Sequence, residues 1–206
     1  MDDKINDIIE ASAKLFQRCG IKSISMDDIA KELSISKKTL YQFVKDKRQL
    51  VELSVEYFLV ENKFHQNISC EGSNAVEQYF MVYQQVVKMI STANFSVEYD
   101  LQKYYPDLHK RVVEVRQKRM FNGIKLNIEK GITEGLYRSE IDVEIISKLN
   151  VLLSESMHNY EFLSDNKAEL IKIMKMNFDY HIHGIASEKG LIEYNRIKNN
   201  LNNQAN

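Results

Sequence analysis

The stretch MDDIAKELSISKKTLYQFV, residues 26–44, carries the strongest structural signal in this chain. A helix-turn-helix needs two short helices that cross closely, so its first helix requires a small residue and the turn must be tight. Ala30 is that small residue, and Ser25 and Ser36 stand where each helix would begin and be capped. The apolar side chains fall where the two helices would share a buried face: Ile29, Leu33, Ile35, Leu40 and Phe43. The stretch therefore predicts a helix-turn-helix.

The region around this motif is locally basic. Residues 31–50 contain six basic side chains and two acidic ones, whereas the whole chain has a formal net charge of −1. Two of the basic residues, Lys37 and Lys38, stand at the start of the second predicted helix of the motif. A basic patch on a slightly acidic chain is typical of a local contact with a polyanion such as DNA.

The remainder of the chain is predicted to be helical because it is poor in residues that break helices. It has one proline and seven glycines among 206 residues, below the average usage of about 5% and 7%. No apolar run is long enough to span a membrane, and the acidic N-terminus differs from a signal peptide. The two cysteines, Cys19 and Cys70, suggest neither a disulfide scaffold nor a zinc site. We therefore expect an all-α, cytoplasmic protein without a membrane contact.

Helical periodicity and capping signals predict about nine or ten helices. The first ends at Cys19-Gly20, since glycine is common just past a helix end, and Asp46 opens a helix that runs to about residue 69. The run EGSN at 71–74 breaks the pattern and is the best candidate boundary. Pro106 fits the first turn of a long helix that ends near Gly131 or Gly135. Further helices are expected over residues 76–90, 96–104, 142–162, 166–183 and 188–201.

The segment Gly20–Val51 resembles the DNA-binding domain of TetR-family transcriptional regulators. The specific part is the run T-L-Y-x-x-F/V-K-x-K-x-x-L, which matches Thr39, Leu40, Tyr41, Val44, Lys45, Lys47 and Leu50. Ser34 departs from the family's commoner glycine in the turn, and serine can be held there at a modest backbone cost. The resemblance implies a three-helix DNA-binding domain over residues 1–48 and a helical ligand-binding and dimerisation domain over residues 49–206.

The candidate DNA contacts lie in and around the motif. The second helix of a helix-turn-helix places its N-terminal residues near base edges, here Lys37, Lys38 and Thr39. Tyr41 and Lys47 resemble the family's phosphate-contacting tyrosine and lysine, and Ser25 resembles a further backbone contact. Plainer interpretations stay open, because the lysines can be merely solvated, the tyrosine can be a packing residue and the serine can be only a cap.

Two predicted helices, at 143–162 and 167–183, are apolar on more than one face. Such a helix needs two surfaces to pack against, and a twofold copy of the chain is a common second one. The resulting homodimer would use Leu149, Leu152, Met174 and Phe178. The alternative is a deeply buried helix pair in a monomer.

Aromatic residues and methionines between residues 76 and 178 can line an apolar ligand cavity. The candidate ligand contacts are Tyr83, Phe95, Tyr99, Met120, Ile124, Met157 and His158. For each of them, ordinary core packing is the alternative. Beside Tyr99, Glu98 and Asp100 are either a cation site or a solvated surface.

The predicted function is a ligand-responsive transcriptional regulator, most simply a repressor that binds a palindromic operator as a dimer. A small hydrophobic or aromatic effector would release it from DNA, with the linkage running through the helix over residues 46–69. The alternative is a helical, DNA-anchored adaptor without ligand control. We expect no enzyme activity, metal or cofactor, because no nucleophile or acid–base constellation is found and the histidines of His181-Ile182-His183 face apart on a helix.

Overall fold

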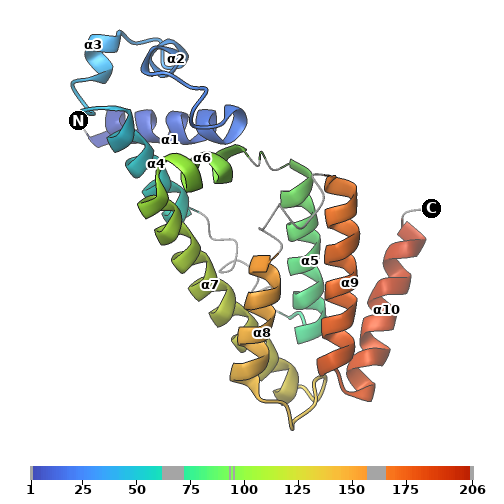
Figure 1. The fold of residues 1–206 in the computed structure, drawn as a ribbon. Coiled ribbons are helices and arrows are strands. Elements are labelled where there is room, and N and C mark those ends of the chain that lie inside the picture. The colour runs from blue at the N-terminus through green and yellow to red at the C-terminus, as the bar shows by residue number, and fades with distance from the viewer. Residues whose placement is uncertain (1, 62–71, 93, 95, 157–165, 205–206) are drawn as a thin grey trace. The chain divides into compact units, whose positions relative to one another are not determined.

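The computed structural model describes residues 2–61, 72–92, 94, 96–156 and 166–204. Within these residues the chain forms ten α-helices and no strand, which confirms the predicted all-α fold (Figure 1). Contacts divide the chain into two compact units, one of Met1–Lys63 with Ala93–Arg116 and one of Phe64–Thr92 with Gln117–Asn206. These units are defined by packing, whereas the boundary predicted between residues 48 and 49 separates a DNA-binding domain from a regulatory domain. That functional boundary stays a prediction.

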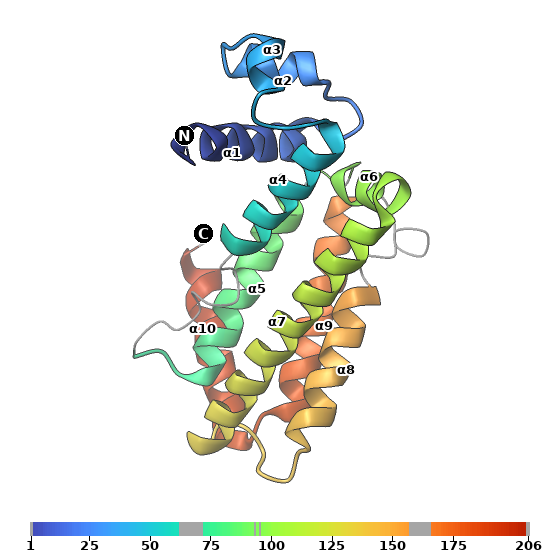
Figure 2. The same cartoon turned by 90° about the vertical axis from the view of Figure 1, so that its left-hand side faces the viewer.

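The first unit holds the N-terminal helices together with a later segment of the chain. Its helices are α1 (Asp2–Cys19), α2 (Met26–Glu32), α3 (Lys37–Leu40), α4 (Lys47–Glu61), α6 (Ser96–Tyr104) and the start of α7 (Pro106–Thr133). Within this unit, α1 lies between the α2–α3 pair and α6 in both views (Figures 1 and 2). One buried apolar cluster joins the elements, and Leu40, Leu50 and Val51 are its most deeply buried members. The helix-turn-helix therefore shares its core with α6 and α7.

Most predicted helix boundaries of this unit agree with the structure. Gly20 ends α1 with a φ of +84°, and the Asp46 side chain accepts a hydrogen bond from the Gln49 backbone N–H at 2.9 Å. Pro106 is the first residue of α7, as predicted. Helix α3 ends at Leu40, before the predicted end at about Phe43, because the Gln42 and Phe43 N–H groups bond to the third residue back. Helix α4 is described to Glu61, and residues 62–69 of the predicted helix lie outside the described residues.

The turn between α2 and α3 adopts the conformation that glycine usually provides. Ser34 has a φ of +54°, and its N–H bonds to the Lys31 carbonyl while the Ile35 N–H bonds to the Ala30 carbonyl. These two bonds form a Schellman motif, which satisfies carbonyls at the helix end. The prediction that serine is held in this turn is therefore confirmed.

The second unit contains α5 (Ala75–Thr92), the rest of α7, α8 (Val143–Ser156), α9 (Lys167–Ile185) and α10 (Glu188–Gln204). Its core centres on α5 and α9, where the Tyr79 and Phe178 rings stack with centroids 3.7 Å apart. Helix α10 packs beside them, next to the segment that follows α7. No described helix is both long and apolar enough to cross a membrane.

Candidate nucleic-acid interface

Caps and a shared buried face fix helices α2 and α3 in the first unit. The Ser25 Oγ accepts a hydrogen bond from the Asp28 backbone N–H, and the Asp28 carboxylate accepts one from the Ser25 N–H. At the start of α3, the Ser36 Oγ accepts a hydrogen bond from the Thr39 backbone N–H at 3.0 Å. The side chains between the two helices are buried: Met26, Ile29, Ala30 and Leu40. The polar face of α3 consequently lies on the surface.

The three residues predicted to approach base edges have different surroundings. The Lys37 Nζ donates to the Asp27 carboxylate on α2 at 2.9 Å, and both side chains are exposed. Thr39 is half-buried, and its Oγ1 lies 2.8 Å from the Ser36 Oγ. Lys38 is exposed and has no hydrogen bond or ion pair to any other described residue. Lys38 thus differs from Lys37 in lacking an intramolecular partner.

The residues predicted to contact phosphate also differ. Tyr41, which follows α3, has 44% of its surface exposed. Lys47, the first residue of α4, is partly buried, and its Nζ donates to the Ile21 carbonyl at 2.6 Å. Burial lowers the pKa of Lys47, and the charges of Asp100 and Asp28 oppose that effect. The Lys47 ammonium is therefore held against the loop between α1 and α2.

Ser25 has an observed role as the N-cap of α2. Its Oγ also donates to the Asp28 carboxylate at 2.6 Å, and the hydrogen bonds from Ser25 lower the pKa of Asp28. If Ser25 contacts DNA, it does so with a hydroxyl group that is already held by hydrogen bonds to Asp28.

Two acidic residues that the sequence offered as a cation site or a solvated surface are internal partners. Asp100 is only 6% exposed and accepts a hydrogen bond from the Lys22 backbone N–H at 2.7 Å. Glu98 lies 2.9 Å from the His109 Nε2 and 3.4 Å from the Arg116 guanidinium. The interpretation as a solvated surface is wrong for Asp100, because the fold buries its carboxylate and pairs it with the Lys22 backbone. The sequence signal that could have indicated the burial of Asp100 is its position next to Leu101, an apolar residue of the predicted helix that is also buried in α6.

The structure brings together only some of the predicted ligand contacts. Tyr83, Met120 and Ile124 are partly buried in the second unit, whereas Phe95, Met157 and His158 lie outside the described residues. Tyr99 lies on α6 in the first unit, is 55% exposed and accepts a hydrogen bond from the Lys103 ammonium. We omit Tyr99 from the proposed ligand site, because an exposed side chain does not wall an enclosed cavity.

A hollow of about 490 Å³ in the second unit contains none of the predicted ligand contacts. It is lined by Asn74, Glu134, Leu136, Lys189, Ile192 and Glu193. Its polar side chains already have partners, since the Asn74 amide donates to Glu193 and Glu134 accepts from the Ala75 backbone N–H. We assign no ligand to this hollow.

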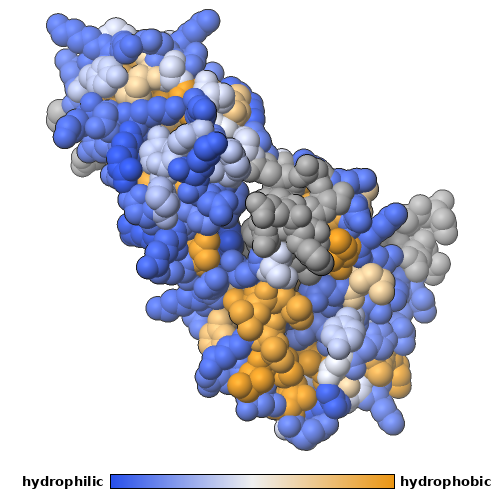
Figure 3. Space-filling model, in the orientation of Figure 1, coloured by the Kyte–Doolittle hydropathy of each residue, from blue (hydrophilic) through white to orange (hydrophobic). Residues whose placement is uncertain are grey.

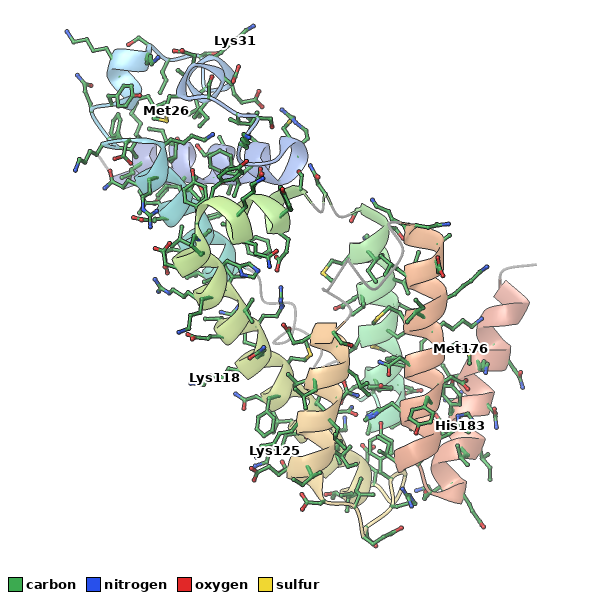
Figure 4. The ribbon with its side chains drawn as sticks, in the orientation of Figure 1. Met26, Lys31, Lys118, Lys125, Met176 and His183 are labelled. Carbon is green, nitrogen blue, oxygen red and sulfur yellow. The ribbon has the colours of Figure 1, made fainter. Side chains whose placement is uncertain are left out.

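The predicted dimer contacts divide into exposed and buried residues. Leu149 and Leu152 on α8 are 49% and 66% exposed, and hydrophobic side chains gather over α8 in the lower part of Figure 3. Met174 on α9 is partly buried. Phe178 is 8% exposed and stacks on Tyr79, so it packs in the core of the second unit and we leave it out of the proposed dimer contact. The exposed apolar residues of α9 are instead Tyr180 and Met176, which is labelled in Figure 4.

The sequence is similar to known bacterial transcriptional regulators. Residues 8–53 match the family model of bacterial regulatory proteins of the tetR family. The HTH-type transcriptional regulator YvaF of Bacillus subtilis is 31% identical over 105 residues, which cover 48% of this chain and 53% of YvaF. The regulator YhgD of the same organism is 25% identical over 161 residues, which cover 71% of this chain and 80% of YhgD. The chain thus spans about half the length of the first relative and more of the second.

A solved structure extends the likeness to the fold of the whole chain. A transcriptional regulator from Cytophaga hutchinsonii superposes with a TM-score of 0.74 at 17% identity, covering 89% of this chain and 99% of the other. At that identity the likeness concerns the fold alone. The family model over residues 8–53 and the Bacillus relatives together support a TetR-family transcriptional regulator, and the solved structure supports its fold.

Proposed function

We propose that this regulator is a repressor that binds a palindromic operator as a homodimer and is released by a small hydrophobic or aromatic ligand. The observation that carries the DNA-binding part is Lys38, an exposed lysine without an intramolecular partner in the described structure, at the start of α3. Residues at this end of a recognition helix approach base edges in the major groove. A lysine there can donate to the O6 and N7 atoms of guanine.

The neighbouring residues have distinct proposed roles. The Thr39 methyl group can contact a thymine methyl. Lys37 must exchange its Asp27 partner for DNA, so we expect it to contribute less to base preference than Lys38. Tyr41, Lys47 and Ser25 would contact phosphates, which position the protein without specifying sequence.

Selection from a random pool of DNA duplexes tests the proposal as a whole. We expect the recovered sites to be palindromic, with half-sites about one helical turn, ~34–36 Å, apart, because a twofold dimer presents two recognition helices. Recovery of asymmetric sites, or no enrichment at any salt concentration, would contradict operator binding by a dimer.

Alanine variants of the two adjacent lysines test the role of Lys38. Lys38→Ala is expected to relax preference at one base pair per half-site by about 1–3 kcal/mol. Lys37→Ala is the matched control and is expected to leave the preferred base unchanged. Affinities are measured for a panel of operators with single base changes. Equal effects of the two variants on base preference would refute the assignment.

The dimer proposal is supported by an apolar stripe along α8. Ile145, Leu149, Leu152 and Leu153 are between 45% and 66% exposed, and their spacing of four, three and one places them on one helix face. Exposed apolar stripes of this kind mark protein–protein contacts in soluble proteins. Met176 and Tyr180 on α9 are spaced by four residues and would add to this contact.

The ligand proposal rests on the character of the second unit. Tyr83, Met120 and Ile124 are partly buried apolar or aromatic side chains. Burial lowers the pKa of His181, whose ring lies 5.1 Å from that of Tyr79 in the same unit, to about 4. His181 is therefore neutral at pH 7, and a neutral effector suits such surroundings better than a charged one. A neutral effector is preferred because burying an unpaired charge costs free energy.

The variant Ile124→Trp tests this ligand proposal. Filling a cavity beside Ile124 is expected to abolish the rise in melting temperature that an effector produces, with operator affinity in the absence of effector unchanged. The probe is a library of neutral apolar and aromatic compounds, followed by operator binding with each hit. If no compound changes either quantity in the parent, the DNA-anchored adaptor without ligand control becomes the better description.

A further inference from the structure

One peptide group in the first unit is held from both sides by charged side chains. The carbonyl of the Ile21–Lys22 peptide accepts a hydrogen bond from the Lys47 ammonium at 2.6 Å. The N–H of the same peptide group donates to the Asp100 carboxylate at 2.7 Å. A continuous path therefore runs from Asp100 on α6, through one planar amide, to Lys47 at the start of α4.

The α6 side of this path is tightly packed. Asp100 is 6% exposed, and a Cβ added to Gly20 would lie 2.7 Å from the Ser96 Oγ of α6. Gly20 thus permits α6 to approach the loop closely. The Lys22 side chain adds a third contact, because its Nζ donates to the Tyr104 hydroxyl at 2.8 Å. The loop between α1 and α2 is consequently fixed to α6 at its backbone and at a side chain.

The Lys47 side keeps donors for another partner. An ammonium has three N–H donors, and the bond to the Ile21 carbonyl uses one of them. A second hydrogen bond, to the Lys22 carbonyl, is long at 3.5 Å, and at least one donor remains. Lys47 is only partly buried, so the remaining donors can reach an acceptor in solvent. An ammonium that is already fixed loses less conformational entropy when it binds an anion.

We propose that Asp100 is a positioning residue for DNA binding, which acts through the Ile21–Lys22 peptide to hold the Lys47 ammonium where it meets a DNA phosphate. The proposal rests on the DNA-binding function above and adds a residue of α6 to it. Negative charge at Asp100 polarises the amide and strengthens its carbonyl as an acceptor, because hydrogen bonds in a chain reinforce one another. Although it is acidic, Asp100 is therefore expected to favour DNA binding.

A double-mutant cycle on operator binding tests this coupling. Asp100→Asn keeps an acceptor for the Lys22 N–H and removes only the charge. We expect it to weaken binding about threefold to tenfold when Lys47 is present and to have no effect in a Lys47→Met background, as for groups in one hydrogen-bond network. Lys47→Met alone should reduce the salt slope by about one. Lys47→Arg, which retains a donor for the carbonyl, should restore sensitivity to Asp100→Asn.

Glu114→Gln provides the matched control for charge. Glu114 is exposed on α7 in the same unit, and its nearest ion-pair partner is Lys110 at 3.9 Å. Loss of the Glu114 charge should leave the affinity for the operator equal to or slightly above that of the parent protein. The proposal would be overturned if Asp100→Asn changed operator affinity no more than Glu114→Gln does. It would also be overturned if Asp100→Asn weakened binding equally with and without Lys47.

Hydrogen exchange at the Lys22 amide tests the path without DNA. Both Asp100→Asn and Lys47→Met are expected to accelerate this exchange in the full-length protein. Each variant weakens or removes one of the two charged hydrogen bonds to the Ile21–Lys22 peptide group. Unchanged exchange in Lys47→Met would disprove the coupling even if Asp100→Asn destabilises the fold. A parent protein that binds no DNA would instead refute the proposed function, and the exchange experiment would still decide the path.

Discussion

Leu152→Glu is expected to convert a dimer of about twice 24.1 kDa into a monomer and to weaken operator binding by at least about 100-fold. Leu152 is 66% exposed in the apolar stripe of α8, and twofold symmetry would place two new carboxylates, one from each protomer, in the contact. Two linked half-sites gain affinity from effective concentration, which a monomer loses entirely. Sedimentation at micromolar concentration and operator titration measure the two effects.

The control for this experiment is the same substitution at an equally exposed leucine. Leu126 on α7 is also 66% exposed but lies outside α8 and α9, so Leu126→Glu should leave both sedimentation and DNA affinity unchanged. A parent that sediments as a monomer would contradict the dimer and, with it, the two-half-site mechanism. Equal behaviour of the two glutamate variants would show that the stripe on α8 is not the contact.

Gly190→Ala is expected to lower the free energy of unfolding by about 3 kcal/mol, at the upper end of the usual cost of overpacking. A Cβ at position 190 would lie 1.9 Å from the Leu136 carbonyl oxygen, which is backbone and cannot rotate away. That carbonyl also accepts a hydrogen bond from the Ser187 N–H at 2.9 Å, so moving it would break a second contact. Urea unfolding followed by circular dichroism gives the value.

A second helical glycine serves as the matched control. A Cβ at Gly184 on α9 would meet nothing within 4 Å. Gly184→Ala should therefore stabilise the protein by about 0.5–1 kcal/mol, the usual difference between alanine and glycine inside a helix. Equal unfolding midpoints for the two variants would mean that α10 does not approach the Leu136 backbone as closely as described here.

Much of the helix-turn-helix could be predicted because its signals act over a few residues. The caps at Ser25, Ser36 and Asp46 each satisfy a backbone N–H three residues ahead, so they depend little on the rest of the fold. Ser34 in the left-handed conformation belongs to the same class. The predicted extent of α3, to about Phe43, was too long, because the Gln42 and Phe43 N–H groups bond to the third residue back and not to the fourth.

The candidate DNA residues could be located from the sequence, but their surroundings could not. Lys37 and Lys38 are adjacent lysines in the same motif, and only the position of Asp27 on the neighbouring helix separates them. Similarly, nothing local indicates that the Lys47 ammonium contacts a carbonyl 26 residues earlier in the chain.

The all-α fold, the position of the helix-turn-helix and most helix ends could be predicted from the sequence, since periodicity and caps are local properties of the chain. Tertiary packing selects which face of each two-sided helix is covered. It buried Phe178 against Tyr79 and left Leu152 exposed, although both are large apolar residues on amphipathic helices. It also made Asp100 an internal partner of Lys22, a residue 78 positions away. Burial and long-range pairing depend on which elements meet in space, and that information is absent from any short segment of sequence.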